Sequence, residues 1–358
     1  MCNEADVVAV PKNMPGLMYP WGIFLFSAGL SLWLTGLIRR YALARNLIDV
    51  PNHRSSHQAP TPRGGGLAIV ATFFAGLLSL WLIGSLPTKV LLALTGAGGL
   101  VAWVGFLDDR RHIAPQWRLA AHFLGAIWGL FWLGQLPPLS LFGHLFYLSW
   151  PGYLLAAVYL VWLLNLYNFM DGIDGIASIE AITVCLGGSL VSVLSAPDGQ
   201  SWQIPALLLS SVVGFLYWNF PRARIFMGDS GSGFLGLTLG LLSIQAAQVA
   251  PELFWCWLIL LGVFIVDATT TLLRRVIRGE AFHEAHRSHA YQYAVRHFAT
   301  HRQVSLAVGL INLLWLLPIT LLVARGSLPG LAGLLIAYTP LVWGAFRCKA
   351  GAKEHQGV

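Results

Sequence analysis

Apolar segments about as long as a lipid bilayer is thick divide the chain. A transmembrane helix needs about 20 consecutive apolar residues, and eleven segments near that length occur among the 358 residues. Only 10% of the residues are charged, whereas a soluble domain carries about 25%. The sequence therefore predicts an all-α, polytopic integral membrane helix bundle with about 11 transmembrane helices. The predicted spans are 20–38, 64–84, 88–106, 117–136, 151–167, 176–195, 203–219, 231–249, 252–272, 303–323 and 329–346.

Basic residues gather in alternate loops of this topology. Nineteen of the 22 lysines and arginines lie in 39–63, 107–118, 220–230, 273–302 and 347–358. Cytoplasmic loops are enriched in Lys and Arg, so these segments are expected in the cytoplasm, with the N-terminus outside and the C-terminus inside. The same distribution explains the net charge of +7 without a nucleic-acid partner.

No repeat or long linker interrupts the pattern, so we expect one membrane domain over residues 1–358. The four cysteines form no CxxC pair, which gives no sign of a disulfide framework or a zinc site.

Six aspartates lie at or beside the predicted cytoplasmic face. They are Asp108 and Asp109 after the third span, Asp171 and Asp174 after the fifth, Asp229 after the seventh, and Asp267 near the end of the ninth. A proton pump or ion-coupled transporter more often holds acids near the midplane. Carboxylates on several loops at one face predict a site assembled at the membrane surface.

Each cluster also has a purely structural explanation. Asp174 and Asp229 precede apolar helices, where an aspartate is often only an N-cap. Asp108 and Asp109 could belong to a solvated loop next to Arg110 and Arg111. If every cluster had only a structural role, we would not expect all of them to lie at the same membrane face.

Clustered carboxylates predict a divalent cation, because Mg²⁺ takes oxygen ligands and often binds through one or two carboxylates plus substrate phosphates. The stretch MGDSGSG (227–233) places glycines around a helix start, where N–H groups and the helix dipole favour anions. Carboxylate, metal and arginine together suit phosphoryl transfer. Arginines on that side include Arg54, Arg63, Arg222, Arg224 and Arg287.

A histidine-rich loop, FHEAHRSHAYQ, covers residues 282–292. The spacing of His283, His286 and His289 could suit a transition metal on a helix, but no thiolate or acid pair completes such a site. Contacts to phosphate or sugar are the preferred interpretation, and a plain amphipathic interfacial loop is the alternative.

Four motifs in order carry a family resemblance. They are DVPNHRSSHQ…PTPRGGG (49–66), the DD pair 108–109, NFMDGIDG (168–175) and FMGDSGSG (226–233). In these motifs the chain resembles the polyprenyl-phosphate N-acetylhexosamine-1-phosphate transferases (glycosyltransferase family 4). The resemblance implies a single catalytic domain with catalytic loops 39–63, 107–118, 168–175, 220–233 and 273–302, in the bacterial inner membrane, with the active site on the cytoplasmic face.

The resemblance implies a reaction with two substrates. Undecaprenyl phosphate, a membrane lipid, attacks the β-phosphate of a UDP-amino sugar, takes up the sugar 1-phosphate and releases UMP. Mg²⁺ is the implied cofactor, with Mn²⁺ as a substitute, and a homodimer is the implied assembly.

Family roles transfer to matching positions. Asp108 would deprotonate or orient the lipid phosphate, with Asp109 beside it, and Asp229 would bind the metal. The remaining implied contacts, to nucleotide and sugar, fall on Asn168, Asp171, Asp174, Arg287 and His289.

Two departures concern the DD motif and the sugar. His112 stands at the last position of a DDxxD pattern, and Tyr291 and Gln292 stand where glucosaminyl transferases carry histidines. The chain is therefore most similar to the branch that starts O-antigen, and thus lipopolysaccharide, with 6-deoxy amino sugars such as N-acetylfucosamine or N-acetylquinovosamine. N-acetylglucosamine remains open.

Other classes fit less well. A CDP-alcohol phosphatidyltransferase needs DGxxAR and further acids, which DGIDGIAS (171–178) lacks. A transporter or flippase would place its acids at mid-depth and release no UMP. A membrane scaffold would leave the acid clusters unexplained.

Overall fold

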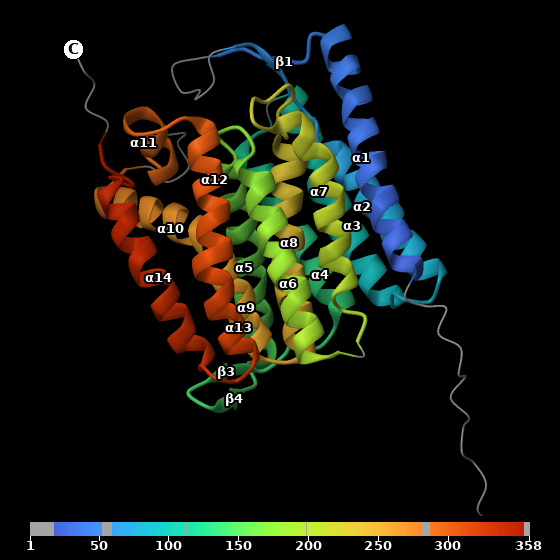
Figure 1. Ribbon diagram of the computed structural model, residues 1–358, viewed down its shortest axis with the longest axis vertical. Coiled ribbons are helices and arrows are strands. Elements are labelled where there is room, and N and C mark those ends of the chain that lie inside the picture. Colours follow the sequence, from blue (N-terminus) through green and yellow to red (C-terminus); the bar gives the residue numbers. More distant parts are fainter. Residues whose placement is uncertain (1–17, 52–58, 112, 198, 281–286, 354–358) are drawn as a thin grey trace, which may run out of the picture.

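The computed structural model describes residues 18–51, 59–111, 113–197, 199–280 and 287–353. Helices run side by side through most of the molecule (Figure 1), and each predicted apolar segment is helical. The helices are α1 (Met18–Ala44), α2 (Gly66–Leu82), α3 (Thr88–Arg110), α4 (Pro115–Leu133), α5 (Ser149–Met170), α6 (Ile176–Ser195), α7 (Gln203–Asn219), α8 (Asp229–Val249), α9 (Glu252–Leu260), α10 (Gly262–Ile277), α11 (Ala290–His297), α12 (His301–Ile311), α13 (Leu317–Ala324) and α14 (Gly330–Arg347).

Two short antiparallel hairpins complete the described elements. One pairs β1 (Ile48–Asp49) with β2 (Thr61–Pro62), and the other pairs β3 (Leu139–Leu141) with β4 (His144–Phe146). They lie at opposite ends of the bundle (Figure 1).

The predicted class of a multi-pass membrane helix bundle is confirmed. Within the described residues, seven helices are long and apolar enough to cross a bilayer, or eight if α9 and α10 form one broken span. The helix α2, with 17 residues, is apolar but shorter. The count of eleven crossings and the orientation of the termini stay predictions.

Helix α8 lies at the centre of the packing. It contacts α3 and α5 extensively, and 83% of its most apolar stretch is buried. Small residues allow this, as is usual between membrane helices: a Cβ at Gly236 would come within 2.8 Å of Leu164 and Tyr167 on α5. At its start, α8 also lies close to α3, because a Cβ at Gly105 would come within 2.6 Å of the Asp229 backbone.

The expectation of an uninterrupted span over 252–272 is wrong. The chain breaks at Leu261, and α9 and α10 meet at an angle of 72°. The buried carboxyl group of Glu180 on α6 lies close to the backbone of Phe264, in the first turn of α10, where N–H groups have no carbonyl partner within their own helix. A broken helix is tolerated at membrane depth where it is buried in protein.

Glu180 is fully buried and is held by a side chain from a distant part of the chain. The side-chain amide of Asn312 donates to Glu180 Oε2 and to Thr183 Oγ1, both at 2.7 Å. Asn312 begins η1 (Asn312–Leu316), a π-helical turn between α12 and α13. This polar contact joins α6 to η1 beside the break, and α10 crosses the bundle at a steep angle to its neighbours (Figure 1).

One experiment checks which end of the bundle faces the cytoplasm. In a variant without Cys2, Cys185, Cys256 and Cys348, a cysteine replaces Arg222, which is exposed near β1, or Phe142, which is 81% exposed in the β3–β4 turn. Because basic loops stay inside, Arg222→Cys should react with a membrane-impermeant thiol reagent only in inverted vesicles, and Phe142→Cys only in intact cells. The reverse pattern would overturn the predicted orientation.

Candidate active site

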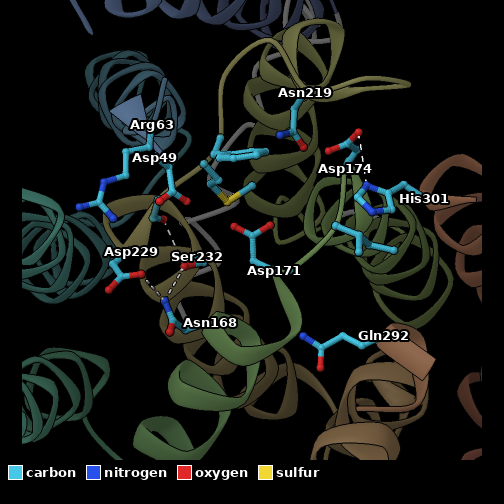
Figure 2. Close-up of a pocket in the computed structure, with 15 residues that line it drawn as sticks. Asp49, Arg63, Asn168, Asp171, Asp174, Asn219, Asp229, Ser232, Gln292 and His301 are labelled. Carbon is cyan, nitrogen blue, oxygen red and sulfur yellow. Dashed lines mark hydrogen bonds and ion pairs between the residues drawn. The ribbon is translucent and has the colours of Figure 1, made fainter. Parts of the chain in front are cut away.

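A polar cavity of about 240 Å³ lies at the end of the bundle that carries β1 and α11. Segments far apart in the sequence meet around it, as Figure 2 shows. Its polar lining residues are Asp49, Arg63, Asn168, Asp171, Asp174, Asn219, Asp229, Ser232, Gln292 and His301. The structure thus brings Asn168, Asp171, Asp174 and Asp229 together, as the motif analysis predicted.

Asn168 connects the end of α5 to the start of α8. Its amide nitrogen donates to Asp229 Oδ1 at 3.0 Å and to Ser232 Oγ at 2.8 Å. These bonds orient the Asp229 carboxylate, whose side chain is still 38% exposed. Asp229 therefore combines a fixed position with a second oxygen, Oδ2, which makes a loose ion pair of 3.8 Å with Arg118.

Asp108 is held by an arginine that the motif analysis did not single out. Arg118 Nη1 lies 2.6 Å from Asp108 Oδ2 and 3.8 Å from Asp229 Oδ2. The backbone N–H of Ile113 donates to the other oxygen of Asp108 at 2.7 Å. Both oxygens of Asp108 are thus engaged, and a phosphate could reach this carboxylate only if Arg118 exchanged partners.

Asp109 closes the start of α8. Its two carboxylate oxygens accept the backbone N–H groups of Asp229 at 3.2 Å and Ser230 at 3.4 Å, and Arg63 donates to its carbonyl oxygen. The anion-attracting helix start, which we expected to receive a substrate phosphate, is therefore taken by this side chain. Gly228 allows the approach, because a Cβ there would lie 2.6 Å from Asp109 Oδ2.

Asp171 is the one lining carboxylate for which no hydrogen bond or ion pair occurs among the described residues. It follows the last residue of α5, and its side chain points into the cavity in Figure 2. Burial raises the pKa of Asp171 from 3.8 to about 7, and the nearby carboxylates of Asp229, Asp109 and Asp174 add to the shift. Such a site attracts a cation.

Asp174 is better satisfied than Asp171. His301 Nδ1 lies 3.5 Å from Asp174 Oδ2, and the hydroxyl of Ser305 donates to the Asp174 carbonyl oxygen at 2.7 Å. Both partners belong to α12, so this helix anchors the loop after α5. The sequence offered no sign of His301, because its partner lies 127 positions away.

Asp267 positions the segment 287–297. From α10 it accepts the backbone N–H groups of Ala290 at 2.9 Å and Tyr291 at 3.0 Å, and His289 Nδ1 lies 3.3 Å away. His289 is only 3% exposed, and it is not among the described residues that line the cavity. Its predicted contact to the sugar is untested, and its visible contact is to Asp267.

The residues after His289 do reach the cavity region. The hydroxyl of Tyr291 donates to the Phe169 carbonyl oxygen at 3.1 Å, and Gln292 lines the cavity. The backbone carbonyl of Arg287 accepts a hydrogen bond from Arg296. Among the earlier candidates, Arg54, His112, His283 and His286 lie outside the described residues.

The described residues include no group of three or more His, Cys, Asp or Glu side chains that could hold a metal alone. Asp171 and Asp229 nevertheless line the same cavity. This pair fits Mg²⁺ only if substrate phosphates complete the coordination, which is how Mg²⁺ commonly binds.

The fold and the cavity define a polytopic helical membrane protein with an acid-lined site at one end. Residues 91–247 match the family model described as glycosyl transferase family 4. The chain is 28% identical to a probable undecaprenyl-phosphate N-acetylglucosaminyl 1-phosphate transferase of Bacillus subtilis (strain 168), over 82% of each protein.

Two further relatives are about as similar. The chain is 30% identical to a decaprenyl-phosphate N-acetylglucosaminephosphotransferase of Mycolicibacterium smegmatis, over 72% of this chain and 70% of the relative. It is 31% identical to a phospho-N-acetylmuramoyl-pentapeptide-transferase of Streptococcus pneumoniae, over 64% of this chain and 70% of the relative. The chain belongs to glycosyl transferase family 4.

The raised pKa of Asp171 predicts a pH-dependent stability. The folded protein binds this proton more tightly than the unfolded chain, so the proton stabilises the fold at low pH, and this stabilisation is lost as pH rises from about 4 through 7. Without divalent cations, Asp171→Asn should therefore melt about 2–4 °C above the unchanged protein at pH 8, roughly 1 kcal/mol after solvent screening. At pH 5 the difference should shrink.

The matched control is Glu252→Gln in the first turn of α9, where no cluster of acids surrounds the carboxylate. It should not raise the melting temperature at pH 8. An Asp171→Asn variant that gained nothing at pH 8 would contradict the proposed crowding of negative charge.

Proposed function

We propose that the protein transfers an N-acetylhexosamine 1-phosphate from a UDP-amino sugar to undecaprenyl phosphate and releases UMP. The observation that carries this proposal is the pair of carboxylates, Asp171 and Asp229, in a polar cavity at the end of a membrane bundle. A water-soluble nucleotide and a membrane lipid can meet there. The names of the relatives, which combine polyprenyl phosphates with amino-sugar phosphate transfer, support the same reaction.

Asp171 and Asp229 are the residues that would hold Mg²⁺, with Mn²⁺ as a substitute. When bound, the ion would offset the charge of the donor diphosphate and favour departure of UMP. The carboxylate of Asp171 has no hydrogen bond or ion pair within the described part of the chain, so it would lose no contact there when it takes a cation, which supports this assignment. Asn168 would keep the Asp229 oxygen oriented, as hydrogen bonds to metal ligands commonly do.

The acceptor phosphate would approach the opposite side of Asp229, where Asp108 and Arg118 lie. In the structure Arg118 is paired with Asp108. An arriving phosphate offers the guanidinium an alternative partner and would release Asp108 to orient the phosphate or take its proton. We place this chemistry at the cytoplasmic face of the bacterial inner membrane, on the basis of the charge distribution of the loops.

The direct test uses purified protein, undecaprenyl phosphate, MgCl₂ and a UDP-amino sugar, and it measures UMP. Release should require the lipid and should stop with chelator. Asp229→Asn should lower kcat at least about a hundredfold, as does loss of one well-placed electrostatic contact in other enzymes, and should raise the Mg²⁺ concentration needed for half-maximal rate.

The control for this variant is Glu252→Gln, which removes a carboxylate far from the cavity and should leave both quantities unchanged. If Asp229→Asn behaved like the control, Asp229 would be only the first residue of a helix. Absence of lipid-dependent UMP release with every donor would overturn the transferase proposal.

We further propose a preference for a 6-deoxy amino sugar and a role in starting O-antigen synthesis. Tyr291 stands where glucosaminyl transferases carry a histidine. Its hydroxyl donates a hydrogen bond to the Phe169 carbonyl oxygen, so this hydroxyl is already engaged within the protein. A site built around a sugar hydroxyl can reject the deoxy analogue by up to about 10⁴-fold. A site that makes no hydrogen bond to that hydroxyl loses less binding free energy when the hydroxyl is missing.

The measurement is kcat/KM for UDP-N-acetylfucosamine, UDP-N-acetylquinovosamine and UDP-N-acetylglucosamine at fixed lipid and Mg²⁺. We expect one of the deoxy donors to equal or exceed UDP-N-acetylglucosamine. A clear preference for UDP-N-acetylglucosamine would reject the deoxy-sugar proposal and leave the transferase reaction standing.

A further inference from the structure

His122 lies in α4, and no hydrogen-bond partner of its side chain occurs among the described residues. It is 7% exposed, its Nδ1 atom is buried without a hydrogen bond, and neither ring nitrogen is hydrogen-bonded within the described part of the chain. Buried polar groups nearly always have partners, and an ionisable residue inside a membrane helix is usually functional. His122 lies within the predicted span 117–136.

The position of His122 connects it to the site. It stands four residues after Arg118, so the two side chains share one face of α4. Both line a second, narrow cavity between α3, α4, α5 and α8, together with Asp108, Asn168 and Asp229. The remaining walls are mainly apolar, with Val101, Val104 and Leu164.

The narrow cavity measures about 10 Å³, which is the space of a single water molecule or of one oxygen atom of a larger group. Arg118 at its rim supplies positive charge, and an imidazole ring offers an N–H donor in either protonation state. The chemistry that suits this place is a phosphate oxygen.

Two phosphates are available, that of the nucleotide and that of the lipid. Asn168 and Asp229 line both cavities, so they form the partition between them. The larger cavity holds Asp49, Asp171 and Asp174. Helix α4, beside the narrow cavity, exposes the apolar side chains of Trp117 and Leu124 by 67% and 60% on its outer side. The geometry favours the lipid phosphate on the α4 side.

We propose that His122 donates a hydrogen bond to the phosphate of the polyprenyl phosphate acceptor, beside the ionic contact from Arg118. This inference rests on the proposed function. His122 is a binding residue for one substrate and leaves recognition of the nucleotide sugar to the other side of Asp229.

The kinetic test compares His122→Phe and His122→Gln. A hydrogen bond to a charged group is typically worth about tenfold to a hundredfold in affinity. His122→Phe should therefore raise KM for undecaprenyl phosphate at least about tenfold and change KM for the donor less than about twofold. His122→Gln, which keeps an N–H donor, should recover most of the loss.

The matched control is His144→Phe in the exposed strand β4 at the opposite end, which should change neither KM. An unchanged lipid KM in His122→Phe, a larger effect on the donor KM, or no recovery in His122→Gln would overturn the proposal.

A binding measurement separates this inference from the transferase reaction. Titration calorimetry in detergent, without donor, would measure a short-chain prenyl phosphate, the corresponding prenol and UMP. We expect the unchanged protein to bind the prenyl phosphate over the prenol, and His122→Phe to lose at least about tenfold for the prenyl phosphate while UMP binding stays the same. Equal prenyl phosphate affinity in both proteins overturns the role of His122, whatever sugar is transferred.

Discussion

The start of α8 is the point on which the site depends. Asp109 from α3 accepts the first two N–H groups of α8, and Asn168 from α5 binds the Asp229 side chain. These hydrogen bonds to carboxylate oxygens, 3.0 to 3.4 Å long, join three helices. Within the described ranges they also leave Oδ2 of Asp229 with only a loose ion pair of 3.8 Å to Arg118. A rigid helix start and a usable carboxylate therefore come from the same set of bonds.

The same arrangement concentrates negative charge that the protein does not neutralise. Asp108 and Asp109 have arginine or backbone partners, whereas Asp171 has none among the described residues. Active sites commonly hold such unfavourable charge, because a ligand that relieves it binds more tightly. In the proposed reaction the divalent cation would offset the charge of these carboxylates, and the donor phosphates would complete the coordination of the cation.

A second constraint is the break between α9 and α10. A continuous helix would carry Asp267 in the line of the bundle. The bend of 72° turns α10 so that Asp267 can accept the first N–H groups of α11. Gln292 on α11 then lines the polar cavity. The orientation of one broken helix thus decides which residues of a loop distant in sequence reach the site.

The sequence by itself determined the membrane class, the helical segments and the gathering of Asn168, Asp171, Asp174 and Asp229. Helix length and hydropathy are local properties, and carboxylates in an apolar chain are expensive enough to be informative. Only the tertiary structure decided the partners, such as Arg118 for Asp108, Asp109 for the start of α8 and His301 for Asp174. A hydrogen bond depends on fractions of an ångström between its two atoms, and its partners can be far apart in the sequence, as Asp109 and Asp229 are at 120 positions. No local sequence pattern records how close two such residues lie in space.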